Sequence, residues 1–139
     1  MFYQAKHFDI EELVDRATFE QFGQKAWMFF NPIVLRQLDN LRDYFELPVT
    51  VNSWAIRGPF QFRGFRPRSY NLGGEFSQHR LGNAFDLDIK GMAASAVRQE
   101  ILTHKDHLLL RDINCIEDKV NWVHFDCRNI SERILVFQP

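Results

Sequence analysis

The segment SQHRLGNAFDLD, Ser77 to Asp88, carries the most specific chemical pattern in the chain and decides how the fold is predicted. It places His79 seven residues before Asp86. A second segment, WVHFD, contains His124 and ends at Asp126. Two histidines and a carboxylate, with one position left open for water, are a common ligand set for catalytic zinc. The two segments therefore predict a metal site that the rest of the chain supports.

The residues around this pattern alternate as a strand does. Apolar side chains fall on one face of the predicted strand Ala84–Ile89, and Asp86 falls on the other. A second strand, predicted over residues 120–126, carries His124. If the two strands are neighbours, Asp86 and His124 converge, and His79 reaches them from the preceding loop. The spacing alone leaves another interpretation open, in which His79 is a surface residue and Asp86 a solvated carboxylate.

Helices precede the metal pattern, and strands cluster around and after it. Asn31 and Pro32 supply an N-cap and a first helical residue, and apolar side chains recur at helical spacing as far as Phe45. Further helices are predicted over residues 10–16, 18–22 and 93–103. Strands are predicted over residues 49–54, 84–89, 113–116, 120–126 and 133–137, with a hairpin turn at 117–119. This order is typical of an α+β fold, with N-terminal helices packed on a small, mainly antiparallel sheet that bears a metal cleft.

Length and composition favour one soluble globular domain. The 139 residues are 45% hydrophobic and 25% charged, and they contain no repeat or linker. We expect a single domain over residues 1–139, with a helical part at about 8–46 and a metal-site core at about 49–137.

Charge, hydropathy and cysteine usage exclude several classes of protein. The net charge of -1 gives no overall attraction to nucleic acid or to a membrane surface. No apolar run approaches roughly 18 residues, and the N-terminus lacks the pattern of a signal peptide. We therefore expect a monomer that is made in the cytoplasm. Cys115 and Cys127 have no paired metal spacing, which predicts buried, reduced thiols.

Residues 55–78, called the arginine loop below, are rich in arginine and aromatic side chains and are broken by glycine and proline. A connection of this length in a compact domain is usually functional. Arginine binds carboxylates through two parallel hydrogen bonds, so a cleft for an anionic peptide is one interpretation. Single-stranded nucleic acid is another, although the near-neutral net charge argues against it.

Three motifs together resemble the zinc D-Ala-D-Ala carboxypeptidase and L-Ala-D-Glu endopeptidase family. The first is Ser-x-His-x-x-Gly-x-Ala-x-Asp at residues 77–86, and the second is Trp-Val-His-x-Asp at 122–126. The third, GFRPRSYN at 64–71 followed by two glycines, is similar to the arginine segment that precedes the family's metal motif. The resemblance covers roughly residues 49–126. Members cleave the stem peptides of bacterial peptidoglycan, and phages carry them among their lysis and virion proteins.

The resemblance implies a role for each matched residue. His79, Asp86 and His124 correspond to the zinc ligands. Arg66 corresponds to the arginine that stabilises the substrate and the developing oxyanion, and Ser77 to a residue that supports the substrate or the ligand loop. The implied reaction is zinc-dependent hydrolysis of a stem-peptide amide bond at the bacterial cell wall. A phage-derived protein without a signal peptide would reach the wall through a holin pore or in a virion.

One position departs from the family pattern. Better-known members have Glu or Asp three residues before the last ligand, as the general base, and this chain has Asn121 there. An amide cannot take a proton from water. Three hypotheses follow: Asp126 acts as the base or as a partner that orients His124; Asp118 reaches in from the hairpin turn; or the protein is a weak or inactive peptidase that kept the fold. The last hypothesis leads to the rival function, a non-catalytic cell-wall-binding or virion structural module on the same fold.

Overall fold

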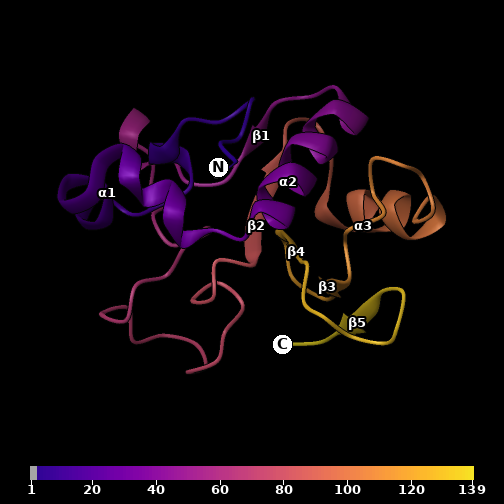
Figure 1. The fold of residues 1–139 in the computed structure, drawn as a ribbon. Coiled ribbons are helices and arrows are strands. Elements are labelled where there is room, and N and C mark those ends of the chain that lie inside the picture. The colour runs from indigo at the N-terminus through magenta and orange to yellow at the C-terminus, as the bar shows by residue number, and fades with distance from the viewer. Residues whose placement is uncertain (1–2) are drawn as a thin grey trace.

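A five-stranded sheet carries most of the segments that make up the predicted metal pattern (Figure 1). The computed structural model describes residues 3–139. The strands lie in the order β1-β2-β4-β3-β5, and neighbours are antiparallel except β3 and β5. Their bounds are Val49–Thr50 (β1), Ala84–Ile89 (β2), Cys115–Glu117 (β3), Val123–Asp126 (β4) and Leu135–Phe137 (β5). The predicted α+β class with a mainly antiparallel sheet is confirmed.

Helices fill most of the chain before the sheet, and one helix lies between β2 and β3 in sequence. In Figure 1 the indigo N-terminal helices gather at one end of the molecule, and α2 crosses in front of β2. The α-helices are Arg16–Phe22 (α1), Pro32–Phe45 (α2) and Ala94–Thr103 (α3). Three 3₁₀ helices span Ile10–Glu12 (η1), Gly23–Phe29 (η2) and Trp54–Ile56 (η3).

Helix α2 begins and packs as its sequence predicts. The side chain of Asn31 accepts a hydrogen bond from the backbone N–H of Ile33 at 3.0 Å, and Pro32 occupies the first turn. The apolar face of α2 and the core face of β2 share one hydrophobic core, which includes Val34, Leu38, Leu41, Phe85 and Leu87. Full burial of each such side chain is worth about 1.5–3 kcal/mol. This core fixes the position of β2, and with it the position of Asp86 on the opposite face.

The Asp86 side chain is buried, because Arg66 of the arginine loop, His79 and His124 lie against it. The same loop also bonds the edge of β2, where the backbone N–H of Asp86 donates to the carbonyl oxygen of Arg63 at 2.7 Å. The alternative interpretation of a solvated strand carboxylate is therefore wrong.

Most other element boundaries differ from the prediction by a few residues. The helix predicted over 10–16 is the 3₁₀ helix η1, the strands predicted over 113–116, 120–126 and 133–137 are the shorter or shifted β3, β4 and β5, and η2 was not predicted. Two of the differences depend on long-range contacts. The strand predicted over 49–54 ends at Thr50, because the Asn52 side chain turns aside to accept from the Arg63 N–H and to donate to the Val14 carbonyl, each at 3.0 Å. The hairpin turn predicted to start at Glu117 starts one residue later. Glu117 remains in β3 because that strand pairs in parallel with β5.

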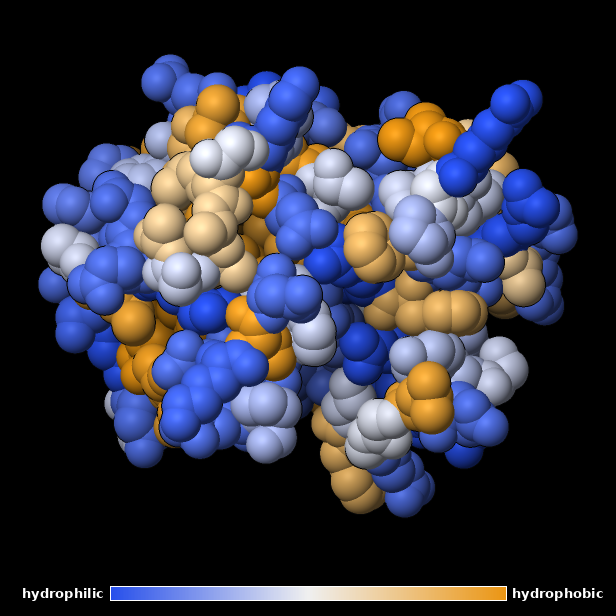
Figure 2. Space-filling view, turned by 180° about the vertical axis from the view of Figure 1, so that it is seen from behind, coloured by the Kyte–Doolittle hydropathy of each residue, from blue (hydrophilic) through white to orange (hydrophobic). Residues whose placement is uncertain are grey.

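Seen from behind, the surface mixes hydrophilic and hydrophobic residues, and a hollow with hydrophilic walls runs into the lower half of that face (Figure 2). None of the helices within residues 3–139 is both long enough and apolar enough to cross a membrane. Cys115 and Cys127 are buried and form no disulfide, as predicted.

The N-terminal segment is tied to α2 by one buried carboxylate, which leads to a stability prediction. Asp39 is 2% exposed and accepts hydrogen bonds from the Tyr3 hydroxyl at 2.5 Å and from the backbone N–H groups of Lys6 and His7. Asp39→Ala leaves these donors without their acceptor, so we expect unfolding by urea to show a loss of about 3 kcal/mol. Asp43→Ala, on the same helix, is the control.

Among residues 3–139, Asp43 pairs only with the exposed ring of His7, and the loss expected there is about 0.5 kcal/mol or less. Equal losses for the two variants would contradict the role given to Asp39.

Candidate metal centre

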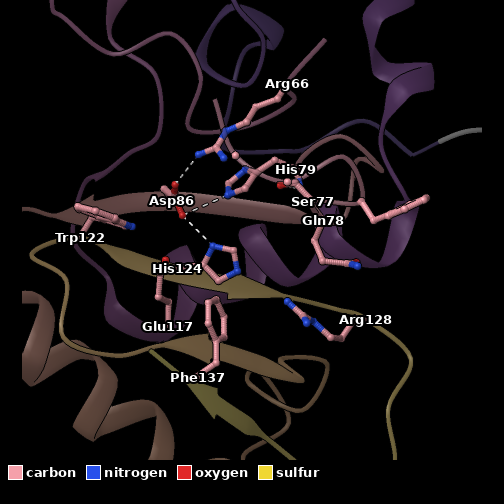
Figure 3. Close-up of a pocket in the computed structure, with 13 residues that line it drawn as sticks. Arg66, Ser77, Gln78, His79, Asp86, Glu117, Trp122, His124, Arg128 and Phe137 are labelled. Atoms are coloured by element: carbon pink, nitrogen blue, oxygen red, sulfur yellow. Dashed lines mark hydrogen bonds and ion pairs between the residues drawn. The ribbon is translucent and has the colours of Figure 1, made fainter. Parts of the chain in front are cut away.

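Three buried side chains meet on the covered face of the sheet. His79, Asp86 and His124 each place one potential ligand atom within 4.8 Å of the others (Figure 3). His124 Nδ1 lies 2.8 Å from Asp86 Oδ1, and His79 Nε2 lies 3.3 Å from the same oxygen. Two imidazole nitrogens and one carboxylate oxygen form a donor set that suits zinc. This cluster, called the triad below, could hold a metal ion.

Strand pairing brings two members of the triad together. Asp86 on β2 lies directly opposite His124 on β4 in the antiparallel register. Side chains at directly opposed positions share a face of the sheet and lie about 4.5–5.5 Å apart at Cβ. The convergence predicted from strand alternation is therefore confirmed, and it follows from the hydrophobic pattern that fixes the register of β2.

His79 comes from the loop before β2, and two glycines fix its position. Gly82 has φ +67°, and a Cβ there would collide with the carbonyl oxygen of Phe29. The Nδ1 of His79 lies 2.9 Å from the carbonyl oxygen of Gly64. A carbonyl only accepts, so Nδ1 donates and the neutral ring presents Nε2 as an acceptor toward Asp86. Burial lowers the pKa of His79, which favours this neutral ring.

His124 is oriented from its other side by Asp126. Its Nε2 lies 2.9 Å from Asp126 Oδ2, and Asp126 is 0% exposed. Arg128 binds both oxygens of this carboxylate, through Nε at 2.8 Å and Nη2 at 2.7 Å. A carboxylate on the outer nitrogen of a ligand histidine is the usual way to fix that ring at a metal site. The arrangement turns Nδ1 of His124 toward Asp86.

Hydrogen bonds and neighbouring charges outweigh burial in setting the pKa values of Asp86, Asp126 and His124. Burial by itself raises the pKa of Asp86 and of Asp126, but hydrogen bonds reverse the shift in both cases. The hydrogen bond from His124 is the strongest influence that holds the pKa of Asp86 well below its usual range. Bonds from Arg128 and His124 lower the pKa of Asp126 to about 2. Burial lowers the pKa of His124, but the two carboxylates raise it to about 9. Both aspartates are therefore anionic at neutral pH, as metal binding requires of Asp86.

Arg66 from the arginine loop faces the triad. Its Nε donates to the carbonyl oxygen of Phe62 at 2.8 Å, and its Nη2 donates to Asp86 Oδ2 at 3.1 Å. The guanidinium also lies over the ring of Tyr70, 5.3 Å from its centroid. These contacts fix the plane of the guanidinium at the edge of the triad, where Figure 3 shows it above Asp86.

Two cavities adjoin the triad and share part of their walls. The first has a volume of about 390 Å³ and is lined in part by all three triad side chains. The second, about 530 Å³, is lined by aromatic and charged side chains of the arginine loop. Arg66, Asp86 and Trp122 border both cavities. The indole N–H of Trp122 is buried and has no acceptor among residues 3–139.

The other predicted site residues do not all line the first cavity. Ser77 lines the first cavity, and its Oγ accepts from the backbone N–H of His79 at 3.3 Å. Asn121 lines the second cavity instead. Asp118 faces Arg98 at 3.4 Å and lines a separate cavity. Asp126 lies behind His124, outside the lining of the first cavity.

Eight residues of the first cavity were not predicted as site residues. They are Gly73, Gly74, Phe76, Gln78, Glu117, Trp122, Arg128 and Phe137. Extending the alternation of β3 by one residue beyond Ile116 would have placed Glu117 on the site face, but the sequence suggested a turn there. Arg128 and Phe137 lay outside the motifs, and nothing local marked them.

Comparison with known proteins agrees with the three motifs. A family model described as Peptidase M15 matches residues 6–126. No curated protein and no solved structure gave a match. The matched range contains the triad, the arginine loop and all strands except β5. The chain therefore belongs to the peptidase M15 family of zinc metallopeptidases.

Proposed function

We propose that the chain hydrolyses an amide bond in the stem peptide of bacterial peptidoglycan, with zinc held by His79, Asp86 and His124. The observation that carries the proposal is the convergence of these three buried groups where two cavities adjoin. The donor set fits zinc, and each histidine has a hydrogen-bond partner on its outer nitrogen, Gly64 or Asp126. Bound zinc lowers the pKa of water to about 7 and polarises a carbonyl group.

The role proposed for Arg66 is to stabilise the negative charge that develops on the carbonyl oxygen of the substrate. Its guanidinium is already held by Phe62, Asp86 and Tyr70, so no reorganisation is needed when that charge appears. Arginine also binds carboxylates through its planar fork, which suits a peptide rich in D-amino acid carboxylates.

The second cavity supplies a surface for the rest of the peptide. Phe62 and Tyr70 stack there with ring centroids 4.4 Å apart, and Arg63 lies over the ring of Phe60 at 4.0 Å. The Arg63 side chain also bonds Asp88 at 2.8 Å, which fixes it in the wall. Cavities adjoining the triad leave room for substrate on either side of the cleaved bond, so the proposal includes both carboxypeptidase and endopeptidase activity.

We further propose the bacterial cell wall as the site of action and a phage-derived protein that works as a monomer. The motif resemblance to compact phage peptidases supports this origin. The near-neutral net charge fits a substrate that is not nucleic acid.

The test is digestion of purified peptidoglycan by zinc-loaded protein. We expect new amino and carboxyl ends to appear, to stop when a chelator removes the metal, and to return when zinc is added. Free D-alanine indicates a carboxypeptidase, and larger fragments with new ends indicate an endopeptidase. Binding to the wall without release of either product would contradict the enzyme and would favour the non-catalytic wall-binding module.

A further inference from the structure

A row of side chains crosses the four neighbouring strands β2, β4, β3 and β5 and runs through the triad. Asp86 on β2 is opposite His124 on β4. The register between β4 and β3 pairs Phe125 with Ile116, and its continuation by one residue places Glu117 opposite His124. Directly opposed residues share a face of the sheet. Glu117 therefore lies on the site face, and β4 lies between its strand and the strand of Asp86.

Glu117 lines the cavity that contains the triad. Figure 3 shows its side chain rising beside His124, with the carboxylate end on the side of Asp86. Within residues 3–139 this carboxylate forms no hydrogen bond or ion pair with another side chain, so its oxygens are free to accept a proton from a molecule in the cavity. Phe137, its neighbour on β5, closes the row and lines the same cavity.

The other carboxylates near the triad are already engaged. Asp126 is bound on both oxygens by Arg128 and lies outside the cavity lining. Asp118 faces Arg98 and lines a separate cavity. Asp88 is bonded by the guanidinium of Arg63. A general base must lie within reach of the proton that it takes and must have a free lone pair, and Glu117 meets both requirements best.

We propose that Glu117 is the catalytic base of this chain, supplied from β3 in the role that Asn121 cannot fill. The assignment rests on the proposed peptidase function. The Glu117 carboxylate takes one proton from the attacking water while the water oxygen bonds to the carbonyl carbon of the substrate. It then gives that proton to the leaving nitrogen as the C–N bond breaks. The products are a free carboxyl group and a free amine, and Glu117 returns to its starting state.

Glu117→Gln tests the assignment, because it keeps the shape of the side chain and removes its basicity. We expect kcat for peptidoglycan fragments to fall by about 10²- to 10⁴-fold. We expect one zinc per chain by mass spectrometry and an unchanged Kd for an intact stem peptide, measured calorimetrically on the zinc-loaded variant. Asp118→Asn, the adjacent carboxylate, is the matched control and should keep kcat within about threefold of wild type, since a surface substitution is usually mild.

Asp126→Asn separates a base from a residue that orients a ligand. We expect it to weaken zinc binding by about 10- to 100-fold and to keep most of its turnover once saturated with zinc. A zinc-saturated Asp126→Asn protein that has lost turnover, beside an active Glu117→Gln protein, would assign the base to Asp126 and overturn the proposal.

The remaining outcomes are also decisive. Wild-type turnover in Glu117→Gln overturns the assignment alone and leaves the peptidase function standing. Loss of zinc from Glu117→Gln overturns it too, because the side chain would then support the metal. Inactive zinc-loaded wild type overturns the proposed function, and the assignment fails with it.

Discussion

Asp86→Asn should abolish both stoichiometric zinc binding and peptidoglycan hydrolysis. The Asp86 carboxylate is the shared partner of His124 at 2.8 Å, of His79 at 3.3 Å and of Arg66 at 3.1 Å. Asparagine keeps the shape but removes the anionic oxygen that a metal ligand supplies. Mutation of a residue that only orients a metal ligand lowers metal affinity or activity by about 10- to 100-fold. Loss of the ligand itself removes the metal, so we expect activity to fall by more than about 1,000-fold.

The same strand offers a matched control for this result. Asp88 lies two residues later on the same face, its side chain is 47% exposed, and it pairs with Arg63. Asp88→Asn should keep one zinc per chain, because this carboxylate is not part of the triad. Thermal melts of both variants check that each remains folded. A folded Asp86→Asn protein that retains one tightly bound zinc would contradict the ligand assignment.

The second large effect is expected at Arg66. Lysine keeps the positive charge but cannot contact Phe62 and Asp86 through a planar fork. We expect Arg66→Lys to lower kcat/KM by about 10²- to 10³-fold, the usual effect of losing one donor to a developing oxyanion, while zinc content stays at one per chain.

Arg68→Lys is the control for Arg66→Lys, because Arg68 is an exposed residue of the same loop and lines neither cavity. It should leave kcat/KM unchanged within about twofold, as surface substitutions usually do. Because both substitutions keep the charge of the loop, equal losses in the two variants would contradict a specific role for the Arg66 guanidinium.

The parts of the fold with strong local signals were predictable to the residue. Helix α2 spans Pro32–Phe45, as its N-cap, proline and apolar spacing predicted, and β2 spans Ala84–Ile89, as its alternation predicted. Errors arose where a distant segment decides the local structure. Asn52 leaves β1 to bond Arg63 and Val14, and no local pattern shows those partners. Local patterns therefore predicted α2 and β2, whereas contacts with distant segments set the end of β1.

The site was predictable to a similar degree. The convergence of Asp86 and His124 followed from alternation and from the assumption that their strands are neighbours, which the register confirms. The surroundings of Asp126 did not follow, because the bond from Arg128 comes from a residue beyond the predicted strand. Glu117 was assigned to a turn, since its place in β3 depends on pairing with β5. Long-range strand pairing, which sequence alone does not give, thus determines which carboxylate faces the cavity.

X-ray absorption at the zinc edge of the purified wild-type protein tests the central claim most directly. Two histidines and one aspartate predict a first coordination sphere of nitrogen and oxygen only, at about 2.0–2.2 Å, with the scattering pattern of two imidazoles. That sphere should be absent from Asp86→Asn. Sulfur at about 2.3 Å, which would indicate Cys115 or Cys127, or the absence of stoichiometric zinc, would contradict the account.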